Sequence, residues 1–183
     1  IPEGEVLIAA KHQSFFDAIL IVSAVPKPKF IMKNSLKYAP VLGWFGLRIG
    51  CICVERGKRT QAIKSMVAAV NSGNSPAGQL IIYPQGTRIA PGASAPYKIG
   101  TAVLYQETGQ TCIPAATNVG VFWPKYGILR QPGLAVVEFL PAIQPGFDNE
   151  EFMHRLEEVI EQSSNALLEE AAIDGFYPLG QDT

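Results

Sequence analysis

The sequence predicts an α/β fold, with one layered domain in which helices flank a central, mostly parallel or mixed sheet. Short apolar runs alternate along the 183-residue chain with longer segments whose apolar residues have helical spacing. Hydrophobic residues make up 48% of the chain and charged residues 17%, a composition typical of a globular protein. No linker rich in Pro, Gly or Ser divides the sequence, so we expect residues 1–183 to form one domain with a single hydrophobic core.

The first half of the chain begins with a buried strand and a capped helix. Ser14 is a candidate helix N-cap, and Asp17, three residues later, supplies the acid of a capping box. This helix must end near Pro26, because proline disfavours helical backbone in the residue before it. The other elements expected here are strands at 5–10, 29–33, 51–54 and 79–83, short helical pieces within 35–49, and a helix at 60–70.

The second half continues the alternation. A loop rich in Pro, Gly and Ala covers 90–96, and the helix that we expect at 97–108 ends at Gly109, a C′ glycine. Strands are expected at 113–122 and 134–140. Asp148 should cap a long last helix, about 149–172, with Glu151 as the acid of its capping box.

Charge is distributed unevenly along the chain. Residues 1–130 contain 14 Lys or Arg and 5 Asp or Glu, whereas residues 131–183 contain 1 and 11. A basic body indicates an anionic partner, such as a phosphorylated metabolite, coenzyme A, anionic lipid or nucleic acid. Nucleic acid is the weakest of these, because no recognition helix or aromatic-stacking motif accompanies the basic residues.

The three cysteines, Cys51, Cys53 and Cys112, are odd in number and lack metal-ligand spacing, so core packing in a reducing cytosol is expected. No apolar run approaches the roughly 20 residues of a membrane-spanning helix. The chain begins at Ile1 rather than Met, which leaves room for an upstream anchor.

A histidine and an aspartate lie five positions apart in residues 11–17 (KHQSFFD). If Ser14 is the N-cap, His12 precedes the helix and Asp17 lies in its first turn. The carboxylate can then hold one imidazole nitrogen and leave the other as a base, as in a catalytic triad without the enzyme nucleophile. The alternative is that Asp17 only supports the helix terminus and His12 packs at a strand end.

Two basic segments follow predicted strands. In residues 83–88 (YPQGTR), Pro and Gly indicate a tight turn, where backbone N–H groups, Thr87 and Arg88 can meet a phosphate. Residues 54–59 (VERGKR) are again basic. The alternatives are an ordinary turn with a surface arginine in the first segment, and a solvated helix entrance in the second.

Together, the His-x4-Asp box, a strand ending near an arginine, the Pro-x-Gly-Thr-Arg turn and Ile-Pro-Ala at 113–115 resemble the glycerolipid acyltransferase family. Its best-known members are the 1-acylglycerol-3-phosphate acyltransferases, which make phosphatidic acid. The resemblance covers roughly residues 5–145. It implies a glycerol-3-phosphate acyltransferase-like fold and an O-acyltransferase of phospholipid biosynthesis.

The resemblance also implies residue roles. His12 would be the general base and Asp17 its partner. The acceptor's phosphate would be held by Arg56, Gly86, Thr87 and Arg88. The acceptor or donor would be positioned by Lys11, Lys33, Gln85 and Pro114. The chain departs from the family's pattern at Lys11, Glu55, Tyr83 and Gln85, which replace Asn, Asp, Phe and Glu. These departures leave base catalysis intact and leave the exact acceptor open.

The implied reaction is direct acyl transfer from acyl-CoA or an acyl carrier protein to a glycerol hydroxyl, with no metal or organic cofactor. No Gly-x-Ser-x-Gly segment supplies a covalent serine. The alternatives are another acceptor, such as lyso-ornithine lipid or water, and a non-catalytic module that binds anionic membranes.

A lipid acceptor implies work at a membrane, and we expect the cytoplasmic face of the inner membrane, with peripheral binding or an anchor missing from this chain. Apolar residues in 38–45, near Lys33, Lys37 and Arg48, are a candidate contact with an anionic surface. The alternative is that Trp44 and Phe45 belong to the core. Oligomeric state and acyl-chain length leave no mark on the sequence.

Overall fold

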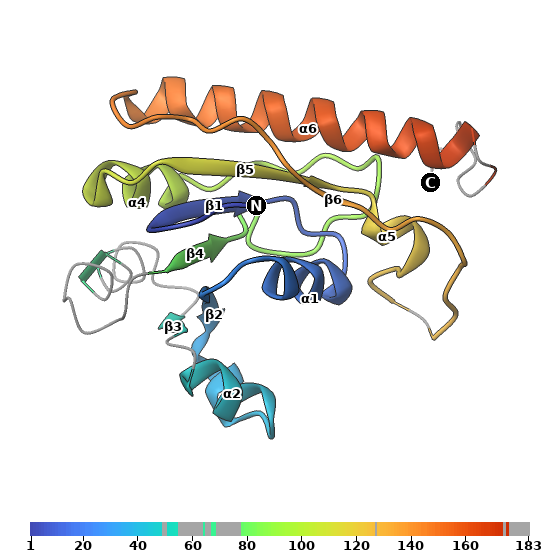
Figure 1. Cartoon of the computed structure of the whole chain (residues 1–183), viewed down its shortest axis with the longest axis horizontal. Coiled ribbons are helices and arrows are strands. Elements are labelled where there is room, and N and C mark those ends of the chain that lie inside the picture. The colour runs from blue at the N-terminus through green and yellow to red at the C-terminus, as the bar shows by residue number, and fades with distance from the viewer. Residues whose placement is uncertain are drawn as a thin grey trace.

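Six strands form one sheet in the order β3-β2-β4-β1-β5-β6 (Figure 1). The structure is a computed structural model that describes residues 1–48, 51–54, 64, 67–68, 78–126, 128–173 and 175. The strands are β1 (Val6–Ala10), β2 (Pro28–Lys33), β3 (Ile52–Val54), β4 (Gln79–Ile82), β5 (Cys112–Thr117) and β6 (Val137–Phe139). All pairings are parallel except that of β6 with β5, so the predicted mostly parallel, mixed sheet is confirmed.

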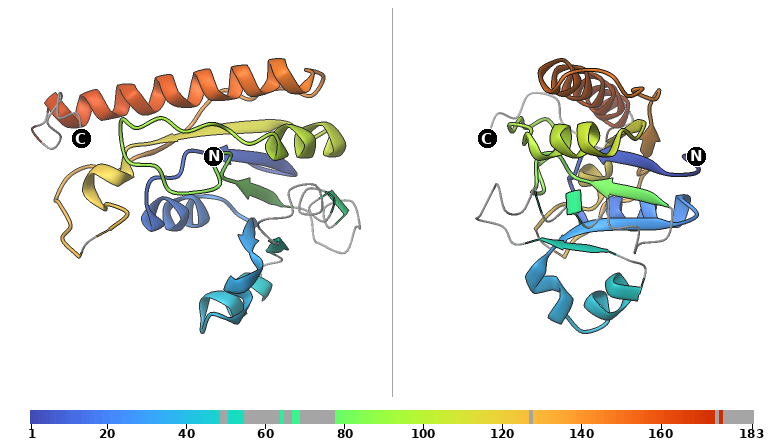
Figure 2. Two further views of the ribbon diagram at one scale, coloured as in Figure 1. Left: turned by 180° about the vertical axis from the view of Figure 1, so that it is seen from behind. Right: turned by 90° about the vertical axis from the view of Figure 1, so that its left-hand side faces the viewer.

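Helices cover both faces of the sheet (Figures 1 and 2). The helices of the described residues are α1 (Phe15–Ala24), the 3-10 helix η1 (Asn34–Tyr38), α2 (Leu42–Arg48), α4 (Gly100–Thr108), α5 (Val119–Phe122) and α6 (Asn149–Ile173). α4 and α6 lie on one face, and α1 lies on the other. The helix predicted at 60–70 falls mostly outside the described residues. None of the helices within the described ranges combines the length and apolar character that crossing a membrane requires.

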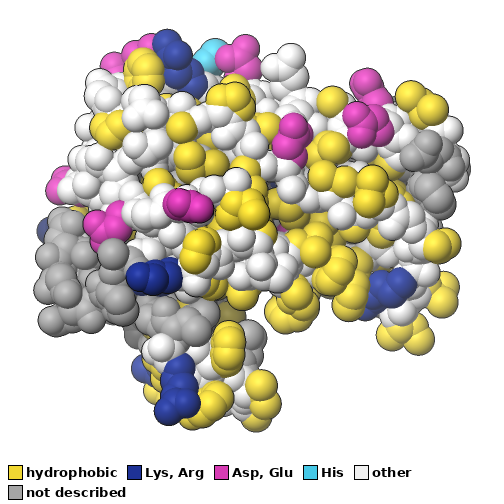
Figure 3. All heavy atoms as spheres, viewed as in Figure 1, with side chains coloured by type: hydrophobic (Ala, Val, Ile, Leu, Met, Phe, Trp, Pro, Cys, Tyr) yellow, Lys and Arg dark blue, Asp and Glu magenta, His cyan; other side chains and the backbone are white. Residues whose placement is uncertain are grey.

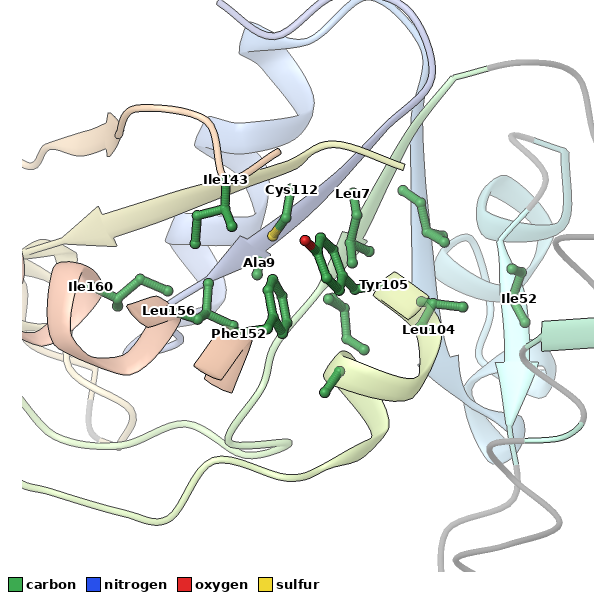
Figure 4. Close-up of a cluster of buried hydrophobic side chains, with 13 residues drawn as sticks. Leu7, Ala9, Ile52, Leu104, Tyr105, Cys112, Ile143, Phe152, Leu156 and Ile160 are labelled. Atoms are coloured by element: carbon green, nitrogen blue, oxygen red, sulfur yellow. The ribbon is translucent and has the colours of Figure 1, made fainter. Parts of the chain in front are cut away.

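The side chains of β1 alternate between the two faces, as the two-residue period of a strand requires. Leu7 and Ala9 join the core cluster under α4 and α6, together with Tyr105 and Phe152 (Figure 4). Ile8 and Ala10 belong to a second cluster that includes Ile21 and Val25 at α1. This alternation decides the face on which each residue after the strand emerges.

One strand prediction, 113–122, is wrong in its second half. β5 ends at Thr117, and residues 119–122 form the short helix α5. The Thr117 hydroxyl accepts a hydrogen bond from the Val119 N–H at 3.1 Å, and Asn118 Oδ1 accepts one from the Val136 N–H at 2.8 Å. These side chains satisfy backbone donors that a strand would place in a ladder, so the chain turns there.

The last helix is amphipathic and starts where predicted. Asp148 Oδ1 accepts a hydrogen bond from the Glu151 N–H at 2.9 Å. One face of α6 is buried through Phe152, Leu156 and Ile160, while His154 on the other face is exposed. The helix therefore closes the core and leaves its acidic face in water.

Candidate active site

The His12 segment and the 84–88 turn meet at the carboxyl edge of the sheet. β1 and β4 are parallel neighbours, so the residues that follow both strands emerge at the same edge. The backbone N–H of Ile89 donates to the carbonyl oxygen of His12 at 2.8 Å. This bond joins two segments that are 77 positions apart in the sequence, and it places both motifs in one site.

Asp17 is held in a fixed position at the start of α1. Ser14 is the N-cap, and Asp17 completes the predicted capping box. Oδ2 of the fully buried carboxylate accepts hydrogen bonds from the N–H groups of Gln13 and Ser14, at 2.8 and 2.7 Å. Oδ1 remains to contact His12 Nδ1, also at 2.8 Å. The predicted reach of the carboxylate back to the imidazole is therefore present.

This contact determines the tautomer of His12. An ionised carboxylate only accepts hydrogen bonds, so Nδ1 carries the proton and donates it to Asp17. Nε2 then keeps its lone pair. The His12 side chain is 19% exposed, and within the described part of the chain its hydrogen bond is made through Nδ1. A neutral imidazole with an oriented, accessible Nε2 can act as a general base.

Tyr83 supports the imidazole from one side. Its ring stacks on that of His12, with centroids 3.9 Å apart and planes 19° apart. Burial, and next the charge of Asp17, raises the pKa of the Tyr83 phenol well above its ordinary value. The phenol therefore stays protonated and points its hydroxyl at Asp17 Oδ1, 3.5 Å away. Where the family usually has Phe, the hydroxyl adds a second donor to Oδ1 of this carboxylate, beside His12.

The turn after β4 presents cationic groups. Gly86 has a φ of 68°, a left-handed conformation that favours glycine. A Cβ at Gly86 would lie 2.5 Å from Lys98 Nζ, so the Lys98 ammonium rests against the turn. Thr87 is exposed and Arg88 partly exposed. The Lys98 N–H also donates to the Pro84 carbonyl at 2.9 Å, which ties the segment before α4 to the turn.

Gln85 is buried in this turn with one polar atom unpaired. Its Nε2 donates weakly to the Ala95 carbonyl at 3.4 Å, while Oε1 has no partner among the described residues. A buried carbonyl oxygen without a donor costs on the order of 1–3 kcal/mol. Such an atom is suited to accept a hydrogen bond from a bound hydroxyl.

Comparisons with known proteins identify the family of the chain. The family model described as Acyltransferase matches residues 1–118, well over half of the chain. The chain belongs to the Acyltransferase family.

Named relatives come from several kingdoms. The chain is 29% identical over 143 residues to the 1-acyl-sn-glycerol-3-phosphate acyltransferase of Pseudomonas aeruginosa, covering 78% of this chain and 56% of that protein. It is 29% identical over 142 residues to the Saccharomyces cerevisiae enzyme of the same name, covering 75% and 46%. The chain thus spans about half the length of these curated relatives.

A solved structure supports the fold. The crystal structure of the 1-acyl-sn-glycerophosphate (LPA) acyltransferase PlsC from Thermotoga maritima aligns with a TM-score of 0.77 at 24% identity. The match covers 91% of this chain and 68% of that one. The predicted acyltransferase-like α/β fold is therefore confirmed.

Two residues predicted to position substrates lie on the opposite face of the sheet from His12. Lys11 continues the Leu7–Ala9 side of β1, and its buried ammonium pairs with Glu161 of α6. Pro114 is buried in β5 and pairs in register with Ala9. Both side chains face the α6 layer, because a strand alternates its side chains between faces. Their predicted role in positioning the acceptor or the donor stays a prediction.

Glu161 is the centre of a small polar cluster under α6. Besides the Lys11 ammonium, it accepts a hydrogen bond from the Tyr97 hydroxyl at 2.9 Å. Burial, and next the Glu161 charge, raises the pKa of Tyr97 well above its ordinary value, so the phenol remains a donor. This cluster links α6 to the segment that carries Lys98.

Two predicted residues are not placed. Arg56 lies outside the described residues, and so does the side chain of Lys33, the last residue of β2. The sequence analysis did not identify Lys98 as a site residue. A lysine at the start of the helix that follows the turn was a possible signal for it. Within the described part of the chain, no group of three or more His, Cys, Asp or Glu is placed to hold a metal ion.

Proposed function

We propose that this chain transfers an acyl group from an acyl thioester to the free hydroxyl of 1-acylglycerol-3-phosphate, giving phosphatidic acid. The donor would be acyl-CoA or an acyl carrier protein thioester, with no further cofactor. The names of the relatives support this acceptor. The observation that carries the proposal is the His12–Asp17 contact at 2.8 Å, because it engages Nδ1 and leaves Nε2 as the ring nitrogen that can act as the base.

The acyl group passes directly from the thioester to the acceptor, with no covalent enzyme intermediate. Nε2 of His12 takes the proton of the acceptor hydroxyl while that oxygen attacks the thioester carbonyl carbon. The carbon–sulfur bond then breaks, and the leaving thiolate receives the proton from the imidazolium. Asp17 stabilises the imidazolium through Nδ1. Much of the acceleration comes from holding two substrates in the right orientation.

The phosphate of the acceptor would bind at the 84–88 turn. Arg88 offers a planar fork of donors, Thr87 a hydroxyl, and Gly86 a backbone that a ligand can approach closely. We add Lys98 to this set because its ammonium lies against Gly86. Arg56 keeps the role that the resemblance implies. The proposal that the partner is a phosphate-bearing lysolipid rests on these groups.

Gln85 would help to select the acceptor. Its buried Oε1 lacks a donor among the described residues, and the glycerol hydroxyl is a donor of the right kind. Where the family usually has a glutamate, the neutral amide removes one negative charge from the phosphate end. The departure leaves the exact acceptor open, and a lysolipid other than 1-acylglycerol-3-phosphate is the alternative.

The test is a thiol-release assay with acyl-CoA, run with and without 1-acylglycerol-3-phosphate. Wild type should release thiol only when the acceptor is present. His12→Ala should lower the rate by about 10³-fold. His154→Ala, at the exposed second histidine on α6, is the matched control and should keep full activity.

The other outcomes separate the alternatives. Release without an acceptor would indicate a hydrolase, and release that His12→Ala leaves unchanged would remove His12 as the base. If only another lysolipid, such as lyso-ornithine lipid, supports release, then the acceptor is different. Vesicle binding without transfer to any acceptor would favour a non-catalytic membrane-binding module. We place the reaction at the cytoplasmic face of the inner membrane, where a lysolipid would be met.

A further inference from the structure

The segment between α5 and β6 exposes an unusual number of large apolar side chains. We call residues 123–134 the apolar loop; residue 127 lies outside the described part of the chain. Four of its side chains are 75–91% exposed: Tyr126, Ile128, Leu129 and Leu134. Single exposed apolar residues are common on proteins, but a contiguous group marks an interaction surface.

The base of the apolar loop is fixed to α1. The Trp123 ring stacks on Phe16 with centroids 4.9 Å apart, and the Arg130 guanidinium lies 4.2 Å from the centre of the Trp123 ring. The Gln131 N–H donates to the Phe122 carbonyl at 3.0 Å. On α1, Phe15 is 49% exposed. The exposed tips therefore project from an anchored base, and they extend the apolar surface of α1.

The charges of the apolar loop indicate what binds it. The loop contains Lys125 and Arg130 and no Asp or Glu. Apolar tips beside cations fit an anionic lipid bilayer, in which the tips enter the acyl region and the cations meet headgroups. Figure 3 shows hydrophobic side chains with Lys or Arg beside them along the lower edge of the molecule.

A second surface of the same composition lies on the same side of the sheet. In η1 and α2, Tyr38 and Trp44 are 78% and 61% exposed, so Trp44 is outside the core. Lys37 lies 4.8 Å from the Tyr38 ring centre and Arg48 lies 4.7 Å from that of Trp44. α2 and the segment after α5 both project on the α1 side, away from α6 (Figures 1 and 2). Two exposed apolar surfaces with adjacent cations that face the same direction can both contact a planar partner, such as a bilayer.

The apolar loop is also bonded to the phosphate turn. Arg88 Nη1 donates to the Lys125 carbonyl at 3.4 Å, and Lys125 Nζ donates to the Arg88 carbonyl at 3.0 Å. This two-way link joins a residue proposed to bind the acceptor phosphate to the base of the exposed tips.

We propose that the apolar loop docks on an anionic lipid bilayer and that docking holds Arg88 in position through Lys125. The second half of this statement rests on the proposed function, because it assumes that Arg88 binds a phosphate. The first half does not, so the two halves are tested by separate measurements. The enzyme would bind its acceptor headgroup more tightly when seated on the membrane that contains it.

Docking is tested by sedimentation of the chain with vesicles of equal parts phosphatidylcholine and phosphatidylglycerol. Ile128→Ser combined with Leu129→Ser should lower binding by about tenfold, since two large apolar groups leave the bilayer. Both side chains are 82–91% exposed, so folding should be unaffected. Ile173→Ser, at an 84% exposed position on α6, is the matched control and should bind as wild type does.

Two results would overturn docking by the loop. One is equal binding of wild type and the double variant. The other is a vesicle-free dimer of wild type that the double variant abolishes, which would make the apolar loop an interface between copies of the chain. Salt should weaken vesicle binding, because the cations contribute to it.

Coupling is tested by binding of sn-glycerol 3-phosphate, the soluble headgroup, with and without these vesicles. Vesicles should tighten headgroup binding to wild type several-fold. Lys125→Met should remove the tightening while retaining most of the vesicle binding, because the apolar tips are intact. If vesicles do not change the affinity of wild type for sn-glycerol 3-phosphate, the coupling is overturned. The same holds if no binding of this headgroup is detected in the presence of vesicles. Loop-dependent vesicle binding with no transfer would instead count against the proposed function alone.

Discussion

The Ile89 N–H donates to the His12 carbonyl oxygen at 2.8 Å, and this single backbone bond aligns the base with the turn proposed to bind phosphate. Ile89→Pro removes the donor, because proline has no N–H. We expect acyl transfer to fall at least tenfold, since the two motifs would no longer be held in register. Steady-state kinetics measures the loss. Ile89→Val keeps the N–H and should retain wild-type activity; an equal loss in that variant would assign the effect to side-chain packing.

Asp17 combines helix capping with orientation of the imidazole, and two variants separate these roles. Asp17→Asn should lower kcat by about 10³-fold or more, because an amide does not stabilise the imidazolium and can present the wrong partner to Nδ1. Ser14→Ala removes only the cap hydrogen bond to the Phe16 N–H and should lower the free energy of unfolding by about 1 kcal/mol. Urea unfolding and kinetics on both variants check this. A large activity loss in Ser14→Ala would mean that capping alone positions His12.

Gly86 and Gly109 form a natural pair of left-handed glycines, with φ values of 68° and 60°. An alanine at either position is strained by about 1 kcal/mol. Only at Gly86 would the new Cβ also meet Lys98 Nζ, whereas at Gly109 it meets nothing within 4 Å. Gly86→Ala should therefore raise the KM for the lysolipid, while Gly109→Ala should only lower the melting temperature. Equal KM values in both variants would exclude Lys98 from the phosphate site.

Lys11 and Glu161 bind each other between β1 and α6, and the Lys11 side chain is almost fully buried. Lys11→Met should leave Glu161 without its cation and lower the free energy of unfolding by about 3 kcal/mol. Glu161 is partly exposed, so water can solvate it and keep the loss at the lower end of the range for buried pairs. Chemical denaturation of both single variants and of the Lys11→Met, Glu161→Met pair gives the coupling free energy.

The double variant is expected to recover much of the lost stability, because two apolar side chains replace a desolvated ion pair. If the losses of the single variants simply add, the two groups do not interact. A large rise in KM for either substrate, with stability unchanged, would support the substrate-positioning role that the resemblance implies for Lys11.

Local patterns predicted most of the elements. The continuous apolar run at 6–10 and the Ser14–Asp17 capping box involve only a few neighbouring residues, so both can be recognised in the sequence. The contact of Asp17 with His12 followed from the same short segment. The strand predicted at 113–122 failed because Thr117 and Asn118 bond to backbone groups, one of them in a segment that follows much later.

The sequence by itself determined the fold class, the capped helix that holds Asp17 against His12, and the glycine turn after β4. Only the tertiary structure decided which face of the sheet Lys11 takes, that Lys98 lies against Gly86, and that Lys125 and Arg88 hold each other. The physical reason is the separation in sequence between the residues that interact. Capping and strand alternation depend on neighbouring residues, whereas these three contacts depend on strand register and on how distant loops pack at the carboxyl edge.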